Sequence, residues 1–593
     1  MAKRISIPNP IIKEVTYSPK SLQELRVNRD LSDKSAQYIF SYPTVYIIDQ
    51  GDKQAFSVYV GETSNILSRT QQHLLEDVKY RSDWKLLYDA PDAYMYIIGH
   101  EFFNKSLTLD IENRLMMYLS SVDKVKTIFN RRTNPQTNYY TSEYLDQIFT
   151  KIWQQLRKRN KDLFPLESVI RDSALFKASP FHKLTQSQID AKDKIIQKIH
   201  LALRHTSHHK LILVNGEAGS GKTVLMSNLF FELWQDEYDD GIDKRLLTPV
   251  LLVNHDQQLK VYQQIAQKLG LIKNAKQDII TKPTSFINRT SPNQVVDLVI
   301  IDEAHLLWTQ GKQSYRGKNQ LLDILDRAKV VVAVFDQKQI LNTNQYWEKD
   351  LMLNMISNQE LERIDLKEQL RMNGSEATVK WIRNFIDHGK VSTIPYDKDY
   401  EIRVFDHPAA LEKAIVEKNS HSQKGISRVI ATFDWEYVDK RKPDNGDYWL
   451  VEDKDWSMPW NLQLPVDRGQ AQLPWSEQSN TIKEVGSTYT VQGFDLNYAG
   501  LIIGPSVKFR DGKIIFDPSA SANKKATQRR TISGTKEKIE VANDLLRNEL
   551  NVLMTRGVNG LYLYAVDPAL QAILKKAQKG DSYGYPQTTY PKD

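Results

Sequence analysis

The sequence predicts an α/β protein with several domains, and three observations support that fold class. The apolar run 211–214 precedes a glycine-rich loop and then a helical pattern. A second apolar run, 297–301, ends in two consecutive carboxylates. Such runs are typical of buried strands whose carboxyl ends carry a site at one edge of a sheet. Near the N-terminus, two short β-rich runs flank the polar turn 49–52 and predict a hairpin.

Composition narrows the class of protein. The 593 residues are 40% hydrophobic and 26% charged, which is typical of soluble globular domains. No apolar run approaches the roughly 20 residues that cross a bilayer, and the first residues lack an apolar signal core, so we expect a cytoplasmic protein. The absence of cysteine excludes disulfides, thiolate zinc sites and cysteine nucleophiles. A net charge of +7 permits a nucleic-acid partner without requiring one.

Short elements follow a polar N-terminal arm, which we expect at 1–40. The capping sequence 63–65 predicts a helix that carries Arg69 and His73 one turn apart, and therefore on one face. Next come a predicted strand at 94–98 and a predicted amphipathic helix at 107–120.

Residues 41–150 resemble the GIY-YIG nuclease family. Two tripeptides match those that name the family, although Thr44 stands where the family usually has glycine: Thr44-Val45-Tyr46 and Tyr59-Val60-Gly61. The family's arginine, histidine, metal-binding glutamate and late asparagine match, in order, Arg69, His73, Glu112 and Asn130. The resemblance implies a small mixed α/β nuclease domain.

The chemistry that this resemblance implies is hydrolysis of a phosphodiester bond. Glu112 would hold one divalent metal, Mg²⁺ or Mn²⁺, which polarises a phosphate oxygen. Tyr46 or His73 would help to deprotonate the attacking water, and Arg69 would neutralise charge on the phosphate. The alternative is a degenerate module that does not cleave. In that case Tyr46 and Tyr59 are half-buried strand aromatics, and Arg69 and His73 lie on a solvated helix face.

A helical connector is expected at 151–182, between two domains. The preceding helix is predicted at 142–158 and leads into the basic run 157–161, a pattern typical of a solvated surface. No internal repeat is evident along the chain.

The segment 216–223 has the pattern of a phosphate-binding loop. It follows a buried strand and opens a helix, which is the context that such a loop requires. Its glycines let backbone N–H groups surround phosphate oxygens, while Lys222 would contact the β- and γ-phosphates and the Thr223 hydroxyl would bind Mg²⁺. The residues predicted to bind ATP here are Gly216, Gly219, Ser220, Gly221, Lys222 and Thr223.

Other residues of the first half extend the predicted ATPase site. Asp302 would hold Mg²⁺ through its water shell, and Glu303 would orient and deprotonate the attacking water. Gln188 lies shortly before the phosphate loop, where helicases recognise adenine through an amide. Gln337 ends the apolar run 330–335 and fits a γ-phosphate sensor, with an ordinary strand end as the alternative.

The second half supplies two arginines and a glutamine–glycine pair. Arg371 precedes a predicted helix, and Arg556 precedes a predicted strand. From a second lobe, both arginines would reach the γ-phosphate and make hydrolysis depend on domain closure. Gln492 and Gly493 belong to a further motif that we expect at the nucleotide.

With these motifs in order, residues 183–575 resemble the superfamily 1 helicases, and more closely the Schlafen group 3-like DNA/RNA helicase domain family. The segments that carry the closer resemblance are 485–488, 492–500 and 551–557, together with Trp460-Asn461. The resemblance implies two RecA-like parallel-sheet lobes, at 183–355 and 356–578, with nucleic acid crossing both.

Two stretches of the second half are candidates for further nucleic-acid contacts. Five of the eleven tryptophans lie within 435–475, a pattern that suits base stacking, although we favour a hydrophobic cluster inside the second lobe. The basic stretch 518–540 predicts a mobile loop that follows a phosphate backbone. The tail 579–593 is expected to be disordered.

Together the motifs predict an ATP-dependent helicase or translocase fused to a divalent-metal-dependent endonuclease, with ATP and Mg²⁺ as cofactors. The expected substrate is DNA, and the architecture suggests prokaryotic anti-phage defence or DNA repair by analogy. Three alternatives are an RNA-directed enzyme, an ATP-gated switch that senses DNA without unwinding it, and a non-catalytic DNA-binding scaffold. No membrane partner is expected, and an oligomer or partner defence proteins are open possibilities.

Overall fold

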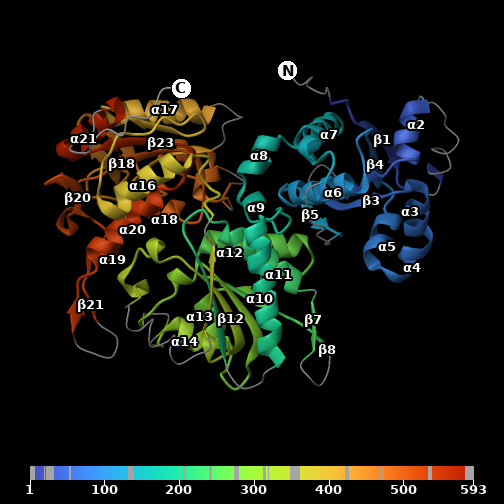
Figure 1. The fold of residues 1–593 in the computed structure, drawn as a ribbon, viewed down its shortest axis with the longest axis horizontal. Coiled ribbons are helices and arrows are strands. Elements are labelled where there is room, and N and C mark those ends of the chain that lie inside the picture. Colours follow the sequence, from blue (N-terminus) through green and yellow to red (C-terminus); the bar gives the residue numbers. More distant parts are fainter. Residues whose placement is uncertain are drawn as a thin grey trace. The chain divides into compact units, whose positions relative to one another are not determined.

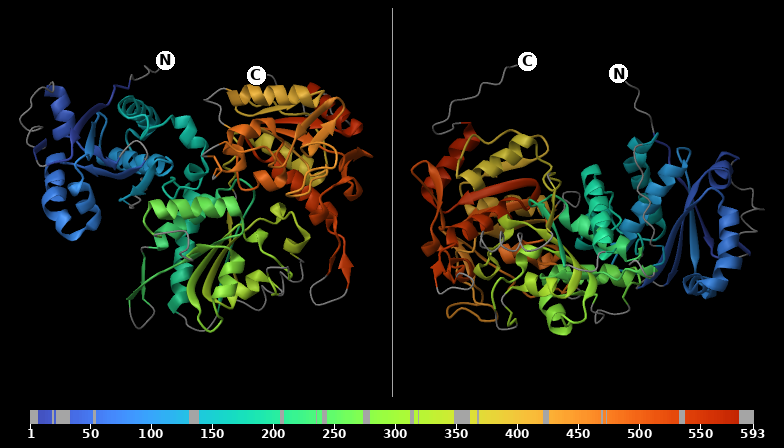
Figure 2. Two further views of the ribbon diagram at one scale, coloured as in Figure 1. Left: turned by 180° about the vertical axis from the view of Figure 1, so that it is seen from behind. Right: turned by 60° about the horizontal axis from the view of Figure 1, so that its bottom comes forward.

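A computed structural model gives the fold, and Figures 1 and 2 show it as ribbons. The described residues are 7–580 except 19, 22–32, 52–54, 131–138, 205–208, 235, 240–243, 273–278, 312–314, 318, 348–360, 367, 421–425, 468–469, 472 and 532–536. The tail 579–593, which the sequence predicts to be disordered, lies almost wholly outside the described residues. Among the helices of the described residues, none has the length and hydrophobicity needed to cross a bilayer.

The chain divides into two compact units, which are described separately. Unit 1 contains Met1–Leu184 and Lys260–Asp278, and unit 2 contains Thr185–Leu259 and Ile279–Asp593. The connector expected at 151–182 is thus part of unit 1, where helix α7 (Leu145–Arg159) buries Trp153 and other apolar residues.

Unit 1 is built on a mixed five-stranded sheet. The order across the sheet is β1-β4-β2-β3-β5, with β3 and β5 parallel and the other pairs antiparallel. The strands are β1 (Ile11–Thr16), β2 (Thr44–Gly51), β3 (Phe56–Thr63), β4 (Tyr94–Gly99) and β5 (Val125–Ile128). The sequence placed an arm at 1–40, but β1 is an edge strand of the sheet. Only Ile12 of this strand is buried, and its polar residues hide the strand pattern.

Helices pack on the sheet of unit 1. The helices in the first part of the chain cover a cluster of buried residues. That cluster joins Tyr46 and Tyr59 of the sheet to Trp84 and Leu87 of α5. The helices are α2 (Asp33–Phe40), α3 (Ile66–Gln72), the π-helix η1 (His73–Asp77), α4 (Val78–Tyr80), α5 (Ser82–Asp89), α6 (Lys105–Ser120), α7, α8 (Glu167–Asp172) and α9 (Ala174–Lys177).

The first lobe of unit 2 has an all-parallel six-stranded sheet in the order β10-β9-β11-β12-β6-β13. Nearly every residue of β12 is buried, as expected for a parallel strand covered on both faces. The strands are β6 (Lys210–Gly216), β9 (Val250–Val253), β10 (Ile280–Thr281), β11 (Val296–Asp302), β12 (Ala328–Phe335) and β13 (Leu361–Leu366). Strand β13 pairs with β6, so this lobe extends past the boundary at 355 that the sequence suggested.

The helices of this lobe follow its strands along the chain. They are α10 (Gln186–Arg204), α11 (Lys222–Leu233), α12 (Asp256–Lys268), α13 (Pro283–Arg289) and α14 (Gln320–Leu325), with a small hairpin of β7 (Glu237–Asp239) and β8 (Lys244–Leu246). Helix α12 begins in unit 2, and its residues from Lys260 onward belong to unit 1.

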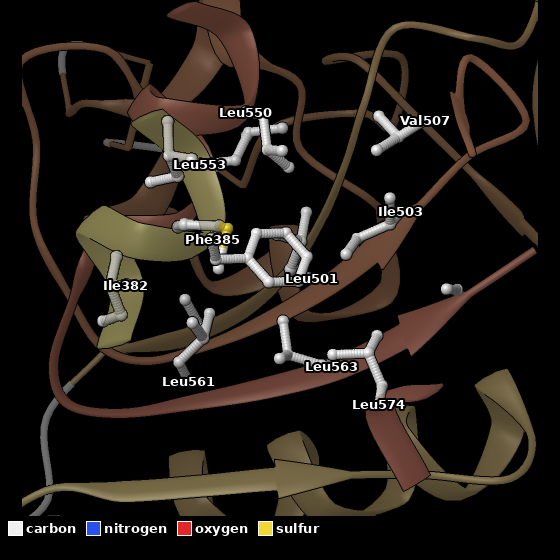
Figure 3. Packing of buried hydrophobic residues seen from close by; sticks show 14 of the residues in the cluster. Ile382, Phe385, Leu501, Ile503, Val507, Leu550, Leu553, Leu561, Leu563 and Leu574 are labelled. Atoms are coloured by element: carbon white, nitrogen blue, oxygen red, sulfur yellow. The ribbon is translucent and has the colours of Figure 1, made fainter. Parts of the chain in front are cut away.

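The second lobe has a parallel four-stranded sheet in the order β14-β23-β18-β15. Figure 3 shows its core, where Ile382 and Phe385 of α16 face Leu501 and Leu563 of the sheet. The strands are β14 (Glu401–Val404), β15 (Ser427–Ala431), β18 (Leu496–Ile503) and β23 (Gly557–Ala565), and the main helices are α16 (Glu376–His388), α17 (Pro408–Ser420), α20 (Ala542–Met554) and α21 (Pro568–Lys579).

The tryptophan-rich stretch lies inside the second lobe. Trp460 and Trp475 have no exposed surface, and Trp456 joins the same buried cluster as Trp460. The indole N–H groups of Trp435 and Trp449 donate to backbone carbonyls. This arrangement favours the hydrophobic cluster over a set of base-stacking platforms.

The stretch 518–540 forms short elements, α19 (Lys524–Thr527), β21 (Arg530–Thr531) and β22 (Lys538–Ile539). Ala526 is fully buried within the core cluster of the first lobe. Arg530 is also buried, and its Nη1 donates to the carbonyl oxygen of Thr343 at 2.6 Å. Arg530 therefore holds the two lobes together and is not presented to a phosphate backbone.

Candidate functional site

The loop 216–223 joins β6 to α11 and has a conformation that only glycine adopts readily. Gly219 and Gly221 have φ of +90° and +75°. A Cβ at 219 would lie 2.7 Å from the Cβ of Arg371, and a Cβ at 221 would lie 2.3 Å from Nε2 of Gln188. Both glycines are thus required by the backbone conformation and by the close approach of predicted site residues.

Lys222 is buried at the start of α11 and contacts the base of the loop. Its Nζ donates to the carbonyl oxygens of Gly216 and Glu217 at 2.7 and 2.8 Å, and lies 3.3 Å from Oδ2 of Asp336. Burial alone would raise the pKa of the Asp336 carboxyl, but the Lys222 ammonium, together with His305 and the Gln339 amide, outweighs burial and holds that pKa below its ordinary value. The lysine charge is therefore balanced before any phosphate is present.

The two predicted carboxylates stand at the end of β11. Oδ2 of Asp302 accepts from Nε2 of Gln258 at 2.8 Å. Glu303 has φ of +53°, a strained conformation for this residue type and one that recurs at functional sites. Its Oε2 is buried without a hydrogen-bond partner in the described structure and lies 3.4 Å from Nδ1 of His305.

The glutamine that reaches this site is Gln339, two residues beyond the predicted Gln337. Gln339 is buried, its Nε2 donates to Oδ2 of Asp336 at 2.7 Å, and its Oε1 accepts from Nη2 of Arg556 at 3.2 Å. Gln337 is exposed. Strand β12 ends one residue before Asp336, and the short turn that follows directs Gln339 inward.

Both predicted arginines of the second lobe reach the first lobe, Arg371 at the phosphate loop and Arg556 at Gln339. The backbone N–H of Leu370 donates to the carbonyl oxygen of Gly219 at 2.7 Å, which holds Arg371 against the loop. Nε of Arg371 lies 2.5 Å from Oδ1 of Asp495. Because the chain crosses from one lobe to the other here, the arginine is positioned by the lobe interface.

Arg556 is fully buried at the end of α20. Its guanidinium donates to the carbonyl oxygens of Val552 and Phe494 as well as to Gln339. Burial, together with the nearby charge of Arg371, lowers the pKa of Arg556 to about 9, so the side chain stays charged at neutral pH. The second lobe thus places one arginine at the phosphate loop and another at Gln339, the hydrogen-bond partner of Asp336.

The predicted pair Gln492 and Gly493 lies at the same interface. Nε2 of Gln492 donates to the carbonyl oxygen of Gln339 at 3.1 Å. Gly493 has φ of +87°. On the other side of the loop, the buried amide of Gln188 accepts from the backbone N–H of Thr185 and directs Nε2 to the carbonyl oxygens of Ser220 and Gly221.

These residues fit a nucleoside triphosphate with Mg²⁺. The buried hydroxyl of Ser220 and the buried Oε2 of Glu303 lack partners in the described structure, and a bound phosphate group with its waters would satisfy both. A hydroxyl on Thr223 and a carboxylate on Asp302 are the oxygen donors that Mg²⁺ prefers. A cleft of about 880 Å³ between the lobes lies beside this site: Gly216, Glu217 and Asp336 line it, whereas Lys222 and the two arginines do not.

A second constellation lies in unit 1, where Tyr46 and Tyr59 stand on neighbouring strands. Tyr46 is opposite Gly61 in the register of β2 and β3, and the two tyrosine rings are stacked with centroids 6.0 Å apart. A Cβ at 61 would lie 2.5 Å from the Tyr46 hydroxyl. Only glycine therefore lets the Tyr46 ring lie flat on the sheet.

The helix after the hairpin brings Arg69 and His73 to these tyrosines. Asn65 caps α3, as the sequence predicted, by accepting from the backbone N–H of Ser68. Nε2 of the fully buried His73 lies 2.8 Å from the Tyr46 hydroxyl. Burial and the neighbouring Tyr59 raise the pKa of Tyr46, and the charge of Arg69 partly offsets that rise.

Glu112 and Asn130 complete the constellation. Oε1 of the buried Glu112 accepts from Nδ2 of Asn130 at 2.8 Å, and the same amide donates to the carbonyl oxygen of Val60. Burial, assisted by the nearby carboxylate of Glu62, raises the pKa of Glu112 to about 8. All six residues that the sequence singled out in this region lie together.

The oxygen donors of unit 1 fit a single hard divalent cation such as Mg²⁺ or Mn²⁺. Glu112 supplies a carboxylate, and Oε2 of Glu62 is buried without a hydrogen-bond partner in the described structure. Within the described ranges there is no cluster of three or more histidine, aspartate or glutamate side chains that could hold a metal. Any cation here would consequently keep several of its waters.

Sequence reasoning missed two residues of this site, Asp77 and Trp84. Oδ2 of Asp77 lies 2.6 Å from Nδ1 of His73, and the ring of Trp84 stacks on the imidazole at 3.6 Å. The four-residue spacing of His73 and Asp77 is a signal that the sequence does contain. No sequence pattern indicates the contact with Trp84.

Comparisons with known proteins identify a family, a relative and a solved structure that are similar to this chain. A family model described as Schlafen group 3, DNA/RNA helicase domain, matches residues 209–567. An uncharacterized protein of Saccharomyces cerevisiae is 32% identical over 408 residues, which are 63% of this chain and 85% of the yeast protein. Among solved structures, Pif1 helicase from Candida albicans is similar at 11% identity and a TM-score of 0.25, over 66% of this chain and 99% of that chain. The family match contains the phosphate loop, both carboxylates and both arginines.

Proposed function

Because this chain belongs to the Schlafen group 3 DNA/RNA helicase domain family, we propose that unit 2 is an ATP-driven motor on nucleic acid and that unit 1 is a GIY-YIG nuclease. The observation that carries the motor is the approach of two arginines of the second lobe to the first lobe, Arg371 at the phosphate loop and Arg556 at Gln339. A site that is complete only when two lobes meet suits a machine that converts ATP hydrolysis into lobe movement.

The roles within the motor follow from the contacts. ATP with Mg²⁺ supplies the transferable phosphoryl group and neutralises part of its charge. Lys222 exchanges its contact with Asp336 for the β- and γ-phosphates, and Glu303 uses its unpartnered Oε2 to accept a proton from water. Arg371 and Arg556 stabilise charge that develops on the γ-phosphate.

Gln339 would couple the nucleotide to the second lobe. Its side chain bonds Asp336, the partner of Lys222, and also Arg556, while its backbone carbonyl accepts from Gln492. A change at the γ-phosphate that draws Lys222 away from Asp336 would therefore reach two residues of the other lobe through a single residue, Gln339. Nucleic acid bound across both lobes would move with that change.

The nuclease role of unit 1 is supported by the arrangement around Tyr46. In this proposal the divalent cation polarises a phosphate oxygen of the substrate. Glu112 and Asn130 hold one side of the site, and Arg69 neutralises charge on the phosphate. Tyr46, bonded to His73, deprotonates the attacking water.

DNA is the substrate that we propose for both units. A nuclease joined to a motor suits defence against foreign DNA, as in phage restriction, or DNA repair. The relative from Saccharomyces cerevisiae indicates that relatives of the chain are not confined to prokaryotes. In cells that restrict phage, Lys222→Ala or Glu112→Ala should abolish restriction, and unchanged restriction by both variants would exclude the defence role.

The experiment that tests the proposal uses the full chain with matched DNA and RNA oligonucleotides. ATP turnover, strand separation and cleavage are measured with Mg²⁺ and with Mn²⁺. Stimulation of ATP turnover by DNA, with separation and cutting of DNA, is the expected result. Cutting of RNA alone would assign the enzyme to RNA, and stimulated turnover without strand separation would instead indicate an ATP-gated switch.

A further inference from the structure

His73 uses both ring nitrogens inside the protein. Its Nδ1 lies 2.6 Å from Oδ2 of Asp77, and its Nε2 lies 2.8 Å from the hydroxyl of Tyr46. We propose that Asp77 is a positioning residue of the nuclease site, which fixes the tautomer of His73 so that the imidazole accepts the phenolic proton of Tyr46. This inference rests on the nuclease function proposed above.

The tautomer follows from what each partner can donate. An ionised carboxylate only accepts hydrogen bonds, so the proton between Asp77 and His73 belongs to Nδ1. In a neutral imidazole, Nε2 is then left with its lone pair, and the Tyr46 hydroxyl must be the donor. The chain of hydrogen bonds therefore runs in one direction, from Tyr46 through His73 to Asp77.

The local backbone and packing hold this chain of groups in place. Helix α3 ends at Gln72, and the π-helix η1 runs from His73 to Asp77, so the wide turn begins and ends at the two interacting residues. Such π turns are rare and frequently occur at functional sites. The fully buried Trp84 stacks on the imidazole with the ring planes 16° apart, which prevents the ring from turning.

The surroundings of His73 keep its imidazole neutral, so that Nε2 has a free lone pair for the Tyr46 hydroxyl. Burial lowers the pKa of His73 to about 4, the charges of Arg69 and Arg81 lower it too, and Asp77 opposes this fall. The imidazole is therefore neutral at pH 7. Once it has accepted a proton, the adjacent carboxylate of Asp77 stabilises the imidazolium that forms.

The phenolic proton of Tyr46 passes to Nε2 of His73, and the phenolate oxygen takes a proton from water. The water oxygen forms a bond to phosphorus, the scissile P–O bond breaks, and its electron pair leaves on the sugar oxygen, which takes a proton from solvent. His73 then releases its extra proton to solvent, so that one water is consumed for each bond cut.

The chain offers a matched control for testing Asp77. Asp83 is a second carboxylate of the same helical region, it pairs with Arg81, and its side chain is 22% exposed against 21% for Asp77. Asp77→Asn and Asp83→Asn therefore remove the same charge from sites of equal exposure. Asp77→Glu, which keeps a carboxylate, serves as the conservative variant.

Two measurements on the full chain test the proposal. Single-turnover cleavage with Mg²⁺ gives the maximal rate and the half-saturating enzyme concentration. Nitrogen-15 NMR of histidine-labelled protein, with the His73 signal assigned by its loss in His73→Gln, gives the tautomer. We expect NMR to show a protonated Nδ1 in the wild type. We expect the maximal cleavage rate of Asp77→Asn to be at least about tenfold lower than that of the wild type, which is a modest part of the rate enhancement that a positioned base contributes. The half-saturating enzyme concentration of Asp77→Asn should equal that of the wild type. Asp83→Asn should cleave at the wild-type rate, and Asp77→Glu should cleave faster than Asp77→Asn.

The outcomes separate this inference from the proposed function. A wild-type His73 that is protonated on Nε2, or an Asp77→Asn variant that cleaves at the wild-type rate, overturns the positioning role. A protonated Nδ1 in a chain that cleaves neither DNA nor RNA supports the hydrogen-bond assignment and overturns the nuclease function instead.

Discussion

The two candidate sites differ in what holds them together. In unit 1, the residues around Tyr46 come from one sheet and the helices packed on it, and hydrogen bonds fix them to one another. In unit 2, the phosphate loop belongs to one lobe, and Arg371 and Arg556 belong to the other. A site on one scaffold has a fixed geometry, whereas a site shared by two lobes changes whenever they move. The first arrangement suits a constant reaction, and the second suits a reaction that must be coupled to motion.

The sites also differ in how their charged side chains are paired. Around Tyr46, the positive charge that acts on the tyrosine comes from Arg69, and His73 is neutral at pH 7. In unit 2, Lys222 is already balanced by Asp336, and Arg371 by Asp495. In the proposed function, a bound triphosphate would replace Asp336 as the partner of Lys222 and Asp495 as the partner of Arg371.

The largest effect that would sharpen this comparison is expected from Arg371→Ala. Removing an arginine that stabilises the γ-phosphate should lower ATP turnover by about 10³-fold or more, because such arginines contribute about 10³–10⁵-fold. ATP-independent cleavage should not change, since the site in unit 1 does not use this residue. Steady-state ATP turnover and plasmid cleavage measure the two activities.

Arg510→Ala is the control, because Arg510 also pairs with an aspartate of the second lobe, Asp567, at 2.8 Å. This variant should hydrolyse ATP as the wild type does. If Arg371→Ala and Arg510→Ala lost equal amounts of ATP turnover, Arg371 would act only through the stability of the second lobe.

A smaller effect distinguishes Gln339 from Gln337. Gln339→Ala removes hydrogen bonds to charged groups on both sides of the lobe interface, each worth about 1.5–3 kcal/mol, which corresponds to about 10–100-fold in ATP turnover. Gln337→Ala, at an exposed position, should have little effect. Should Gln337→Ala be the more damaging of the two, the coupling role would belong to Gln337, as the sequence first suggested.

The smallest effect concerns the stability of unit 1 in acid. The pKa of His73 falls from 6.5 to about 4 on folding, so the unfolded chain takes up the proton first as pH decreases. Unit 1 should lose up to about 3 kcal/mol of unfolding free energy between pH 6.5 and pH 4, with no contribution from His73 above pH 6.5. Hydrogen exchange of the β2 and β3 amides against pH measures this slope.

His73→Gln should flatten that slope, whereas His388→Gln, at an exposed position of unit 2, should leave it unchanged. An unchanged slope in His73→Gln would show that the imidazole is not held neutral by the fold.

Local sequence predicted those parts of the molecule that depend on local chemistry. The phosphate loop, the carboxylates after β11 and the capped helix with Arg69 and His73 each have a spacing set by one strand, turn or helix. Helix and strand periodicity likewise located the buried strands β6, β11 and β12, and the family suggested for unit 2 is confirmed.

Contacts between distant segments were not predictable in the same way. Strand β13 joins the first lobe only because it pairs with β6, which lies about 150 residues earlier in the chain. Gln339 and Gln337 are equivalent in sequence, and only the turn after β12 decides which of them is buried. Arg530 belonged to a basic stretch typical of solvent exposure, yet tertiary packing buries it against Thr343.

The most direct test of the account compares Glu112→Gln with Lys222→Ala in the full chain. Plasmid cleavage with Mg²⁺, with and without ATP, is measured beside ATP turnover. We expect Glu112→Gln to lose cleavage while its ATP turnover stays near the wild-type rate. We expect Lys222→Ala to lose ATP turnover, to keep ATP-independent cleavage, and to lose any response of cleavage to ATP. Cleavage that persists in Glu112→Gln, or that disappears in Lys222→Ala when ATP is absent, would contradict the assignment of two separate sites.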